Sequence, residues 1–426
     1  MIIGINAAAA IKQPRTGVEE YVYQLIKHLT MLPEAREHRF FLYAPSIKNK
    51  KCHAEFISAS HGIPKQVRDD KKENLFDFPL PPNFIIKELK WPLPFLWTQM
   101  RLAWELRWHK PDALFIPAHV LPFVSSENSV VAVHGLEYEY FPEHYLFWRR
   151  WYLRWSTKSA VRRARKIIAV SENTKNDLVK LYRVKAEKIE VVHHGISFSH
   201  SDPAEAGEES RPNGRSGIRQ RSLATLGMTA VAKPYILYLG RLETKKNVQG
   251  ILEAYKILKK EYGVPHELVL AGGRGYGYEK IKEKIDNFND YHAEFISAPH
   301  GIPKQVRDDK IIEPGYVDND TKWQLLSGAD IFIFPSFYEG FGLPILEAQS
   351  AGVPVVTSAN SCLPEIAGEG ALFVNPKNPA QIAEAIKLII DDSDLRDKLR
   401  QSGFENLKRF SWAKCAKETL GVVARP

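Results

Sequence analysis

Two glutamates eight residues apart, Glu339 and Glu347, flank a Gly-Phe-Gly-Leu-Pro sequence in the stretch FYEGFGLPILEA. A carboxylate can accept two hydrogen bonds from neighbouring hydroxyl groups, which suits a sugar or a ribose. Gly340 and Gly342 allow the backbone to adopt positive φ and to approach a ligand closely. Pro344 suits the first turn of a helix, whose unpaired N–H groups favour an anion or a sugar oxygen. The stretch predicts a sugar-nucleotide site; taken alone, it also fits a tight turn before a helix with a dipole-favoured glutamate.

A second stretch, YLGRLETKKN, carries two cations after an apolar run. Arg241 follows the run directly, and Lys246 lies five residues later, near the start of the next expected helix. A guanidinium binds phosphate with a planar fork and an ammonium binds it as a point charge, so the pair can hold a diphosphate as it leaves. Each charge-assisted bond that tightens as charge develops contributes roughly 1.5 to 3 kcal/mol. Either cation alone is also an ordinary solvated surface residue.

Two further stretches carry residues that suit the same ligand at the end or the start of an apolar pattern. In VAVHGLEYEYFPEHY, His134 follows a strand pattern, where a histidine can donate to a sugar hydroxyl or to a reacting centre. In RTGVEEYVYQLIKHL, Thr16-Gly17-Val18 precedes a helix and offers a second backbone cradle for a diphosphate. A structural histidine and a simple turn are the alternatives.

Two patterns point to other chemistry and match it poorly. VLAGGRGYGYEKI begins like a dinucleotide-binding fingerprint, but Tyr278 stands at the place of the third glycine and no acidic residue follows at the usual distance. We interpret it as a strand-to-helix turn that lines the nucleotide. The incomplete fingerprint weakens the alternative that the chain is a nicotinamide oxidoreductase. Asp318-Asn319-Asp320 matches the metal-binding Asp-x-Asp of another class of sugar transferase, a match that means little among 50 acidic residues.

The elements that position these residues alternate between apolar runs and amphipathic helices, as in doubly wound α/β domains. The expected strands are 1–7, 40–45, 113–118, 130–135, 166–171 and 188–195 in the first half, and 235–240, 267–273, 331–336, 354–358 and 371–375 in the second. Expected helices include 244–262 and 378–402. We expect two Rossmann-like domains that face each other across a cleft, with ligands at the carboxyl ends of the strands.

A near-perfect repeat interrupts this pattern. HAEFISASHGIPKQVRDDK at 53–71 recurs at 292–310 with one difference, Ser60 against Pro299. A structural repeat keeps a pattern and lets its letters drift, so we interpret both copies as insertions that form solvated loops without chemistry. A third block, 199–234, is poor in large apolar residues, which is typical of a flexible linker.

The boundaries follow from these inserts and runs. We expect an N-terminal acceptor-side domain over 1–195 with an insert at about 51–71, and a linker with an insert over 196–233. A nucleotide-sugar-binding domain over 234–407 follows, with an insert at about 291–310. A final helix over 408–426 completes the chain.

Composition limits the class of protein. Hydrophobic residues make up 44% of the 426 residues and charged residues 26%, which is typical of a globular protein. No apolar run reaches the ~20 residues of a membrane span, and Cys52, Cys362 and Cys415 lack the spacing of a zinc site or a disulfide scaffold. We therefore expect a cytoplasmic protein. The net charge of +9 suits phosphorylated substrates, a membrane surface or a polyanion.

The segment WRRWYLRWSTKSAVRRARK at 148–166 is both aromatic and basic. It can lie on an anionic membrane as a peripheral contact, or form an ordinary amphipathic helix whose tryptophans pack inward. We favour inward packing, and the two interpretations are compatible.

Taken together, these motifs make the chain resemble the retaining GT-B glycosyltransferases of family four, in the mannosyltransferase B-like branch. The resemblance rests on TGVEEY, HGLEYEYFPE, AVSENTKNDL, YLGRLETKKN, GYVDNDTKWQLLSGADIFIFPSFYEGFGLPILEA and FSWAKCAKETL. It implies a GT-B fold and transfer of a hexose with retention, without a metal, from a nucleotide sugar to a glycan or polyprenyl-linked acceptor in cell-surface polysaccharide synthesis. GDP-mannose is the implied donor, with UDP- or ADP-hexoses as alternatives, and nucleic acid is not an implied partner.

The resemblance also implies residue roles. Arg241 and Lys246 would hold the diphosphate, Glu347 the ribose and the backbone near Val317 the base. The transferred sugar would lie on the amides and side chains of a loop that comprises Glu339, Gly340, Phe341, Gly342 and Leu343.

By the same resemblance, the final helix would cross back to the N-terminal domain. Three further positions complete the implied roles. His134 would face the sugar, and Gly17 would approach the phosphates. Gly135 stands where the family usually has Asp. A non-catalytic sugar-nucleotide or carbohydrate-binding protein derived from the same fold is the alternative.

Overall fold

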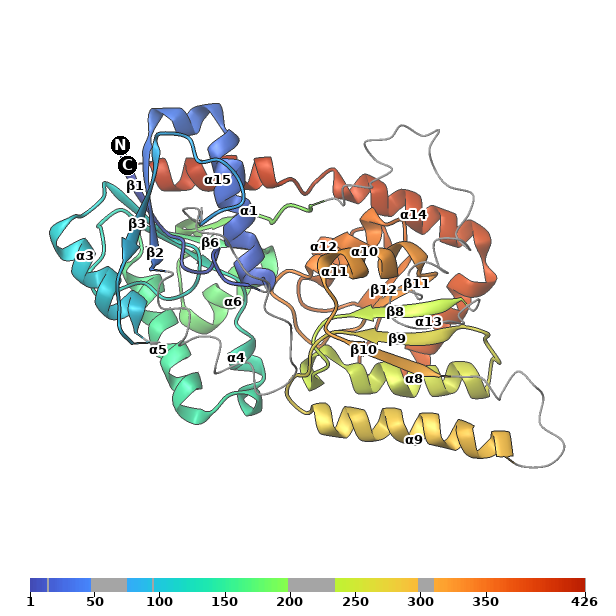
Figure 1. Ribbon diagram of the computed structural model, residues 1–426. Coiled ribbons are helices and arrows are strands. Elements are labelled where there is room, and N and C mark those ends of the chain that lie inside the picture. The colour runs from blue at the N-terminus through green and yellow to red at the C-terminus, as the bar shows by residue number, and fades with distance from the viewer. Residues whose placement is uncertain (14, 47–74, 94–95, 198–233, 298–309, 426) are drawn as a thin grey trace, which may run out of the picture. The chain divides into compact units, whose positions relative to one another are not determined.

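The computed structural model describes residues 1–13, 15–46, 75–93, 96–197, 234–297 and 310–425 (Figure 1). The chain divides into two compact units, Met1–Gly195 with Trp412–Pro426, and Ile196–Ser411. The first repeat copy, 53–71, lies outside the described residues, as does the linker block up to residue 233. Of the second copy, 292–297 continue a helix that begins at Tyr278.

The first unit holds a sheet of seven parallel strands in the order β3-β2-β1-β4-β5-β6-β7. The reversal of order beside β1 is typical of a doubly wound sheet. Six strands were expected from the sequence. The strands are β1 Ile2–Asn6, β2 Arg39–Pro45, β3 Phe84–Leu89, β4 Ala113–Ile116, β5 Ser129–Val133, β6 Lys166–Ala169 and β7 Ile189–Val191.

Helices cover both faces of this sheet, because alternate residues of each strand point to opposite sides. Ala113 and Phe115 of β4 pack with α1 (Gly17–Met31) and α15 (Trp412–Ala424). Leu114 and Ile116 pack on the other face, with the helices η3 Trp97–Leu102, α3 Ala103–Trp108, α4 Glu137–Tyr140, α5 Phe147–Arg163 and α6 Glu172–Tyr182.

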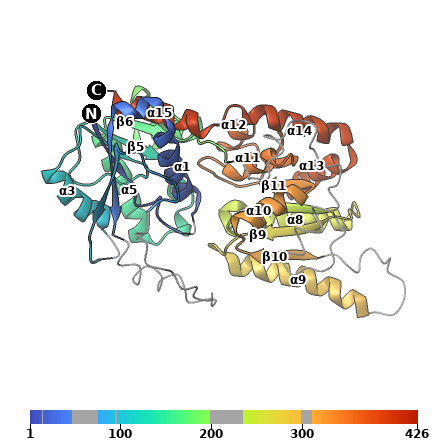
Figure 2. The same cartoon turned by 45° about the horizontal axis from the view of Figure 1, so that its top comes forward.

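The last helix, α15, packs against α1, and both views show the two side by side (Figures 1 and 2). Polar contacts secure α15 at two places. Lys417 Nζ lies 2.9 Å from Glu34 Oε1, and Arg165 donates to the Val422 carbonyl at 2.6 Å.

The expectation that the tryptophans of 148–166 pack inward is wrong for all three. Trp148 is 66% exposed, Trp151 61% and Trp155 37%. The buried side of α5 is formed by Ser156, Thr157, Ala160 and Val161 instead. These small side chains let the helix lie close to the sheet, where indole rings would not fit.

The second unit holds six parallel strands in the order β10-β9-β8-β11-β12-β13. The strand order reverses between β8 and β11, which are neighbours at the centre, and such a switch point is where doubly wound sheets bind ligands. The strands are β8 Tyr235–Leu239, β9 Glu267–Ala271, β10 Ile311–Gly315, β11 Ile331–Phe334, β12 Val355–Ser358 and β13 Ala371–Val374. The α/β fold class is thus confirmed in both units.

The helices of the second unit include two corrections. The expected helix 244–262 is a 3-10 helix, Thr244–Lys246, and an α-helix, Val248–Lys260, separated by Asn247 with φ 58°. The expected helix 378–402 is two helices, α13 and α14, because Asp392 interrupts it and its side chain accepts a hydrogen bond from Leu395 N. The helices are η7 Thr244–Lys246, α8 Val248–Lys260, α9 Tyr278–Ser297, α10 Asn319–Gly328, α11 Leu343–Ser350, α12 Leu363–Ala367, α13 Pro379–Asp391 and α14 Ser393–Leu407.

Candidate active site

The segment after β8 folds tightly over the segment after β9. A Cβ on Gly272 would lie 1.8 Å from the Gly240 carbonyl oxygen, so this backbone contact requires glycine. Further on, Gly275 packs against Glu243 and Gly277 against Thr244. Of the two glycines that imitate a dinucleotide fingerprint, Gly275 thus serves packing, whereas a Cβ on Gly273 would meet nothing within 4 Å. The predicted strand-to-helix turn is present between β9 and α9. The glycine contacts fix the path of residues 240–246.

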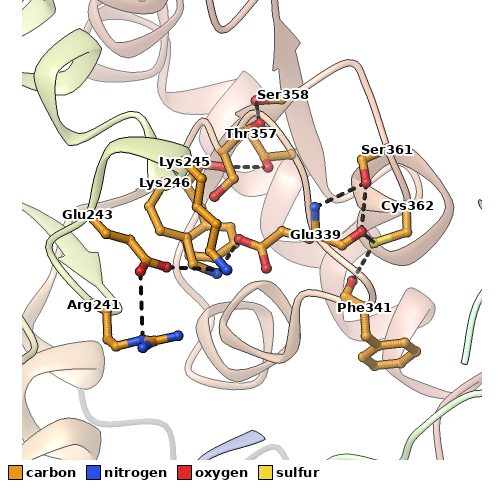
Figure 3. Close-up of polar contacts among 12 residues, drawn as sticks. Arg241, Glu243, Lys245, Lys246, Glu339, Phe341, Thr357, Ser358, Ser361 and Cys362 are labelled. Atoms are coloured by element: carbon orange, nitrogen blue, oxygen red, sulfur yellow. Dashed lines mark hydrogen bonds and ion pairs between the residues drawn. The ribbon is translucent and has the colours of Figure 1, made fainter. Parts of the chain in front are cut away.

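Lys246 and Glu339 meet at the switch point, from the ends of β8 and β11. Lys246 Nζ lies 2.5 Å from Glu339 Oε1, and both side chains are largely buried, at 15% and 12% exposed (Figure 3). The ammonium also lies 5.4 Å from the centre of the Phe334 ring. Lys246 is therefore not an ordinary solvated lysine. Its ammonium has three donors, of which Glu339 takes one.

Arg241 differs from Lys246 because its side chain is 64% exposed. Its Nε lies 3.9 Å from Glu243 Oε2, and Lys245 Nζ lies 3.5 Å from Glu243 Oε1 (Figure 3). The Tyr238 hydroxyl donates to the Arg241 carbonyl at 2.9 Å and so holds the backbone there. Glu243 and Lys245, which the sequence reasoning missed, are almost fully buried, and Glu243 lies between the two cations. The guanidinium fork of Arg241 is left facing solvent.

Ser361 and Cys362 hold the loop that carries Glu339. The Ser361 hydroxyl donates to the Glu339 carbonyl at 2.6 Å and accepts from Glu339 N at 3.1 Å (Figure 3). Cys362 Sγ lies 3.2 Å from the Glu339 carbonyl oxygen and 3.1 Å from that of Phe341. Burial raises the pKa of the Cys362 thiol well above its usual value, so it stays protonated and donates. Both residues escaped the sequence reasoning, because no local pattern marks a contact across 22 residues.

The loop then enters α11 as the sequence predicts. Gly342 has φ 101° and directly precedes the helix, and Pro344 lies in the first turn. Gly340 does not share the positive φ, so that expectation is wrong for Gly340. The first bond of the turn is from Ile345 N to the Gly342 carbonyl at 3.0 Å. The amide of Leu343 precedes it at the positive end of the helix dipole.

Glu347 is paired, not free. Lys322 of α10 lies 2.6 Å from Glu347 Oε1, and both side chains are mostly buried. Val317, which lies between β10 and α10, packs against the core. The side chain of Asp318 accepts from Thr321 N at 2.8 Å and caps α10, which accounts for that residue without a metal. Among the residues that the structure describes, no group of three or more His, Cys, Asp or Glu side chains could hold a metal ion.

His134 lies directly after β5 in the first unit. Its Nε2 lies 2.7 Å from the Pro117 carbonyl, which can only accept, so Nε2 carries the proton and Nδ1 is an acceptor. Burial, and secondarily the charge of His119, lower the pKa of His134 to about 4. The ring therefore stays neutral at physiological pH. A substrate hydroxyl would donate to Nδ1, so the expectation that His134 donates is reversed in this arrangement.

The surroundings of His134 are aromatic and tightly packed. The ring centre lies 4.7 Å from that of Tyr21, 5.4 Å from that of His194 and 6.0 Å from that of His119. Burial lowers the pKa of both neighbouring histidines as well. Gly135 has φ 143°, a conformation that an aspartate would adopt only with strain.

Gly17 is the first residue of α1, and it is exposed. A Cβ built on it meets nothing within 4 Å, and its φ is not positive. The fold itself gives no reason for glycine at this position. Glu19, in the first turn of α1, is close enough for its charge to oppose the lowering of the His134 pKa, so the start of α1 and His134 lie in the same region of the first unit.

Comparisons with known proteins show the family and the fold of the chain. A family model described as "Glycosyl transferases group 1" matches residues 229–406, and one described as "Glycosyltransferase Family 4" matches 15–200. The fold is that of GT-B glycosyltransferases. WaaG, a glycosyltransferase involved in lipopolysaccharide biosynthesis, is similar with a TM-score of 0.64 at 15% identity over 100% of both chains. Sucrose-phosphate synthase from Thermosynechococcus elongatus is similar with a TM-score of 0.63 at 16% identity, over 99% of this chain and 98% of the other.

Two curated relatives sharpen the assignment. The chain is 28% identical to O-antigen chain mannosyltransferase B of Escherichia coli, over 98% of each chain. It is 23% identical to O-antigen chain mannosyltransferase RfbU of Salmonella typhimurium strain LT2, over 93% of this chain and 94% of the relative. The protein belongs to glycosyltransferase family 4, in the group that contains these O-antigen mannosyltransferases.

Proposed function

We propose that the protein transfers mannose from GDP-mannose to a lipid-linked glycan, with retention of anomeric configuration and without a metal. The product would be a growing cell-surface polysaccharide. The O-antigen chain mannosyltransferases that resemble this chain support the choice of mannose and of a glycan acceptor. The enzyme would act in the cytoplasm, at the inner face of a membrane where a polyprenyl-linked acceptor is held.

The observation that carries the proposal is the buried pair of Lys246 and Glu339 at the switch point, with Arg241 exposed beside it. When the bond from sugar to diphosphate breaks, negative charge develops on the leaving phosphate. Lys246 has two remaining donors to meet that charge, and Arg241 can add its fork. At roughly 1.5 to 3 kcal/mol for each charge-assisted bond, the two cations would contribute on the order of a thousandfold in rate or more.

The remaining groups would orient the donor. Glu339, positioned by Ser361, would accept hydrogen bonds from hydroxyls of the transferred hexose. The amides of Gly340 to Leu343 would face oxygens of the same hexose. Glu347 would bind the ribose, and its ion pair with Lys322 holds that carboxylate in place.

Three other groups would also take part. The backbone at Val317 would contact the base. In the first unit, neutral His134 would accept from a sugar hydroxyl through Nδ1, and the amide end of α1 at Gly17 would approach a phosphate.

Retention would follow from front-face attack. Glu339 is committed to an ion pair with Lys246, so it is a poor nucleophile for a covalent intermediate. The acceptor hydroxyl would then attack on the side from which the diphosphate leaves, and a phosphate oxygen would take its proton. The cations that stabilise the leaving group would therefore also position the phosphate oxygen that takes the proton.

The test is a panel of nucleotide sugars offered to the purified full chain, with slow donor hydrolysis and thermal stabilisation as readouts. GDP-mannose should give the largest response, and turnover should persist in chelator. The anomeric coupling of the product, measured by NMR on a glycan acceptor, should match that of the donor. A larger response to a UDP- or ADP-hexose than to GDP-mannose would change the assignment of the donor. Binding without turnover for every donor would favour the non-catalytic sugar-nucleotide-binding alternative.

A further inference from the structure

An exposed apolar stripe runs along η3 and α3 in the first unit. Leu96, Met100, Trp104 and Trp108 recur at intervals of four residues and are 46%, 50%, 66% and 65% exposed. Large apolar side chains normally face the core of a helix-covered sheet, as Leu102 and Leu106 do here. A stripe of this kind left in solvent marks an interaction surface.

α5 carries a second stripe. Phe147 is 84% exposed, and Trp148 and Trp151 are exposed by more than half, with Trp155 at 37%. Every described tryptophan that is exposed lies on α3 or α5. This concentration separates the two stripes from the scattered apolar residues of an ordinary protein surface.

The segment 121–123 joins the two stripes. The Leu121 carbonyl accepts from Gln99 of η3 at 3.2 Å and from Arg163 of α5 at 3.3 Å. The ring of Phe123, itself 55% exposed, lies 5.8 Å from that of Trp155. η3, α3 and α5 all pack on the same face of the sheet. We call this region the α3–α5 surface; it comprises Leu96, Met100, Trp104, Trp108, Phe123, Phe147, Trp148, Trp151 and Trp155.

A basic groove of about 880 Å³ adjoins this surface, between α5 and the residues that follow α6. Its lining includes seven cations and a single acid, Glu139, whose carboxylate is taken by Arg154 at 3.0 Å and by the Tyr182 hydroxyl at 2.7 Å. α5 itself has six basic residues and no acidic residue. The groove therefore offers positive charge to an anionic ligand. The cations are Arg150, Arg154, Lys158, Arg162, Arg183, Lys185 and Lys188.

We propose that the α3–α5 surface docks the first unit on an anionic lipid bilayer, with the phosphates of lipid headgroups in the basic groove. Tryptophan favours the boundary between headgroups and acyl chains, where its ring is apolar and its N–H is wet. Basic residues beside such rings are attracted to anionic lipids. A protein partner would have to match both an aromatic stripe and a strongly basic groove, whereas a bilayer supplies apolar and anionic layers together. The inference rests on the proposed function only for the purpose of the docking, which is to bring the enzyme to a lipid-linked acceptor.

Vesicle flotation of the purified full chain tests the proposal. Vesicles with about 30% phosphatidylglycerol should bind the protein, and pure phosphatidylcholine vesicles should bind it at least about tenfold more weakly. Raising salt from about 0.1 M to about 0.5 M should release most of the protein, because the attraction is screened. Bromine-labelled lipid should quench the tryptophan fluorescence of the bound protein.

Two double variants identify the surface. Trp148→Ser with Trp151→Ser, and Lys158→Glu with Arg162→Glu, should each weaken binding to anionic vesicles at least about tenfold. Matched controls on the second unit, the exposed Leu388→Ser and Lys377→Glu, should bind normally. Unfolding curves at pH 7.5 verify that the variants are folded.

Two outcomes would overturn the proposal. One is vesicle binding that neither double variant reduces. The other is a protein that ignores vesicles but forms an oligomer that Trp148→Ser with Trp151→Ser dissociates, since the surface would then be covered by a second copy. Donor hydrolysis in vesicle-free solution should be unchanged in both variants. If the unaltered protein lacks that hydrolysis yet binds vesicles, the proposed function fails while the docking surface stands.

Discussion

His134 provides a pH dependence whose size follows from its burial. Its pKa in the folded protein is about 4, against an ordinary value of 6.5, because burial, and secondarily His119, disfavour the charged ring. The unfolded chain therefore binds a proton at His134 in a range where the folded protein does not. Stability is complete above pH 6.5 and falls as the pH drops from 6.5 towards 4.

The difference between 6.5 and about 4 corresponds to roughly 3 kcal/mol, at about 1.36 kcal/mol for each pH unit. His134→Gln isolates this contribution, because the glutamine amide can still donate to the Pro117 carbonyl and does not titrate. The stability advantage of the unaltered protein over the variant should shrink by up to roughly 3 kcal/mol between pH 7 and pH 4. Carboxylate titrations act on both proteins and cancel in the comparison.

Hydrogen exchange at increasing urea, followed by mass spectrometry on peptides of β5 and α1, reports the opening free energy of this unit alone. The exposed His109→Gln serves as control and should keep the pH dependence of the unaltered protein. If the difference between the unaltered protein and His134→Gln is the same at pH 7 and pH 4.5, the buried neutral histidine is refuted.

Three further substitutions separate ligand roles from structural ones. Gly17→Ala should keep the free energy of unfolding or raise it by up to about 0.5 to 1 kcal/mol, since nothing crowds the new methyl group. The same variant should raise the donor KM at least about tenfold if a phosphate approaches this backbone. A normal KM would remove Gly17 from the site. Gly135→Asp should lower stability by about 1 to 3 kcal/mol because of its φ of 143°, and an unchanged melting temperature would contradict that strain. Ser361→Gly fits the positive φ of this residue but removes the hydroxyl that holds Glu339, so kcat/KM should fall roughly tenfold or more; full activity would show that the hydroxyl is dispensable.

The predictable parts of the fold were those with strong local patterns. Uniformly apolar runs gave the central strands, because parallel strands are buried on both faces. β3 escaped because its sequence FIIKEL mixes charges into an edge strand, where one side faces solvent. The helix 378–402 was predicted as one continuous helix. The break at Asp392 was missed because an aspartate acts as an N-cap only where the chain turns, and tertiary packing sets that turn.

The candidate site divides in the same way. Arg241, Lys246, Glu339 and His134 stand at strand ends, where a sequence pattern can identify them. The partners of these residues come from distant segments, and no local pattern predicts their contacts. Such contacts include Lys322 with Glu347 and Ser361 with the Glu339 backbone. The tautomer of His134 depends on the Pro117 carbonyl and could be read only from the structure.

The most direct test of the central claim is the turnover of nucleotide sugar by Lys246→Ala, measured beside Glu339→Ala and the exposed control Lys256→Ala. If the switch-point pair grips the leaving diphosphate and the hexose, the first two variants should stay folded and lose roughly tenfold to a thousandfold in kcat/KM, while the control keeps its rate. Near-normal turnover in both Lys246→Ala and Glu339→Ala would contradict the account.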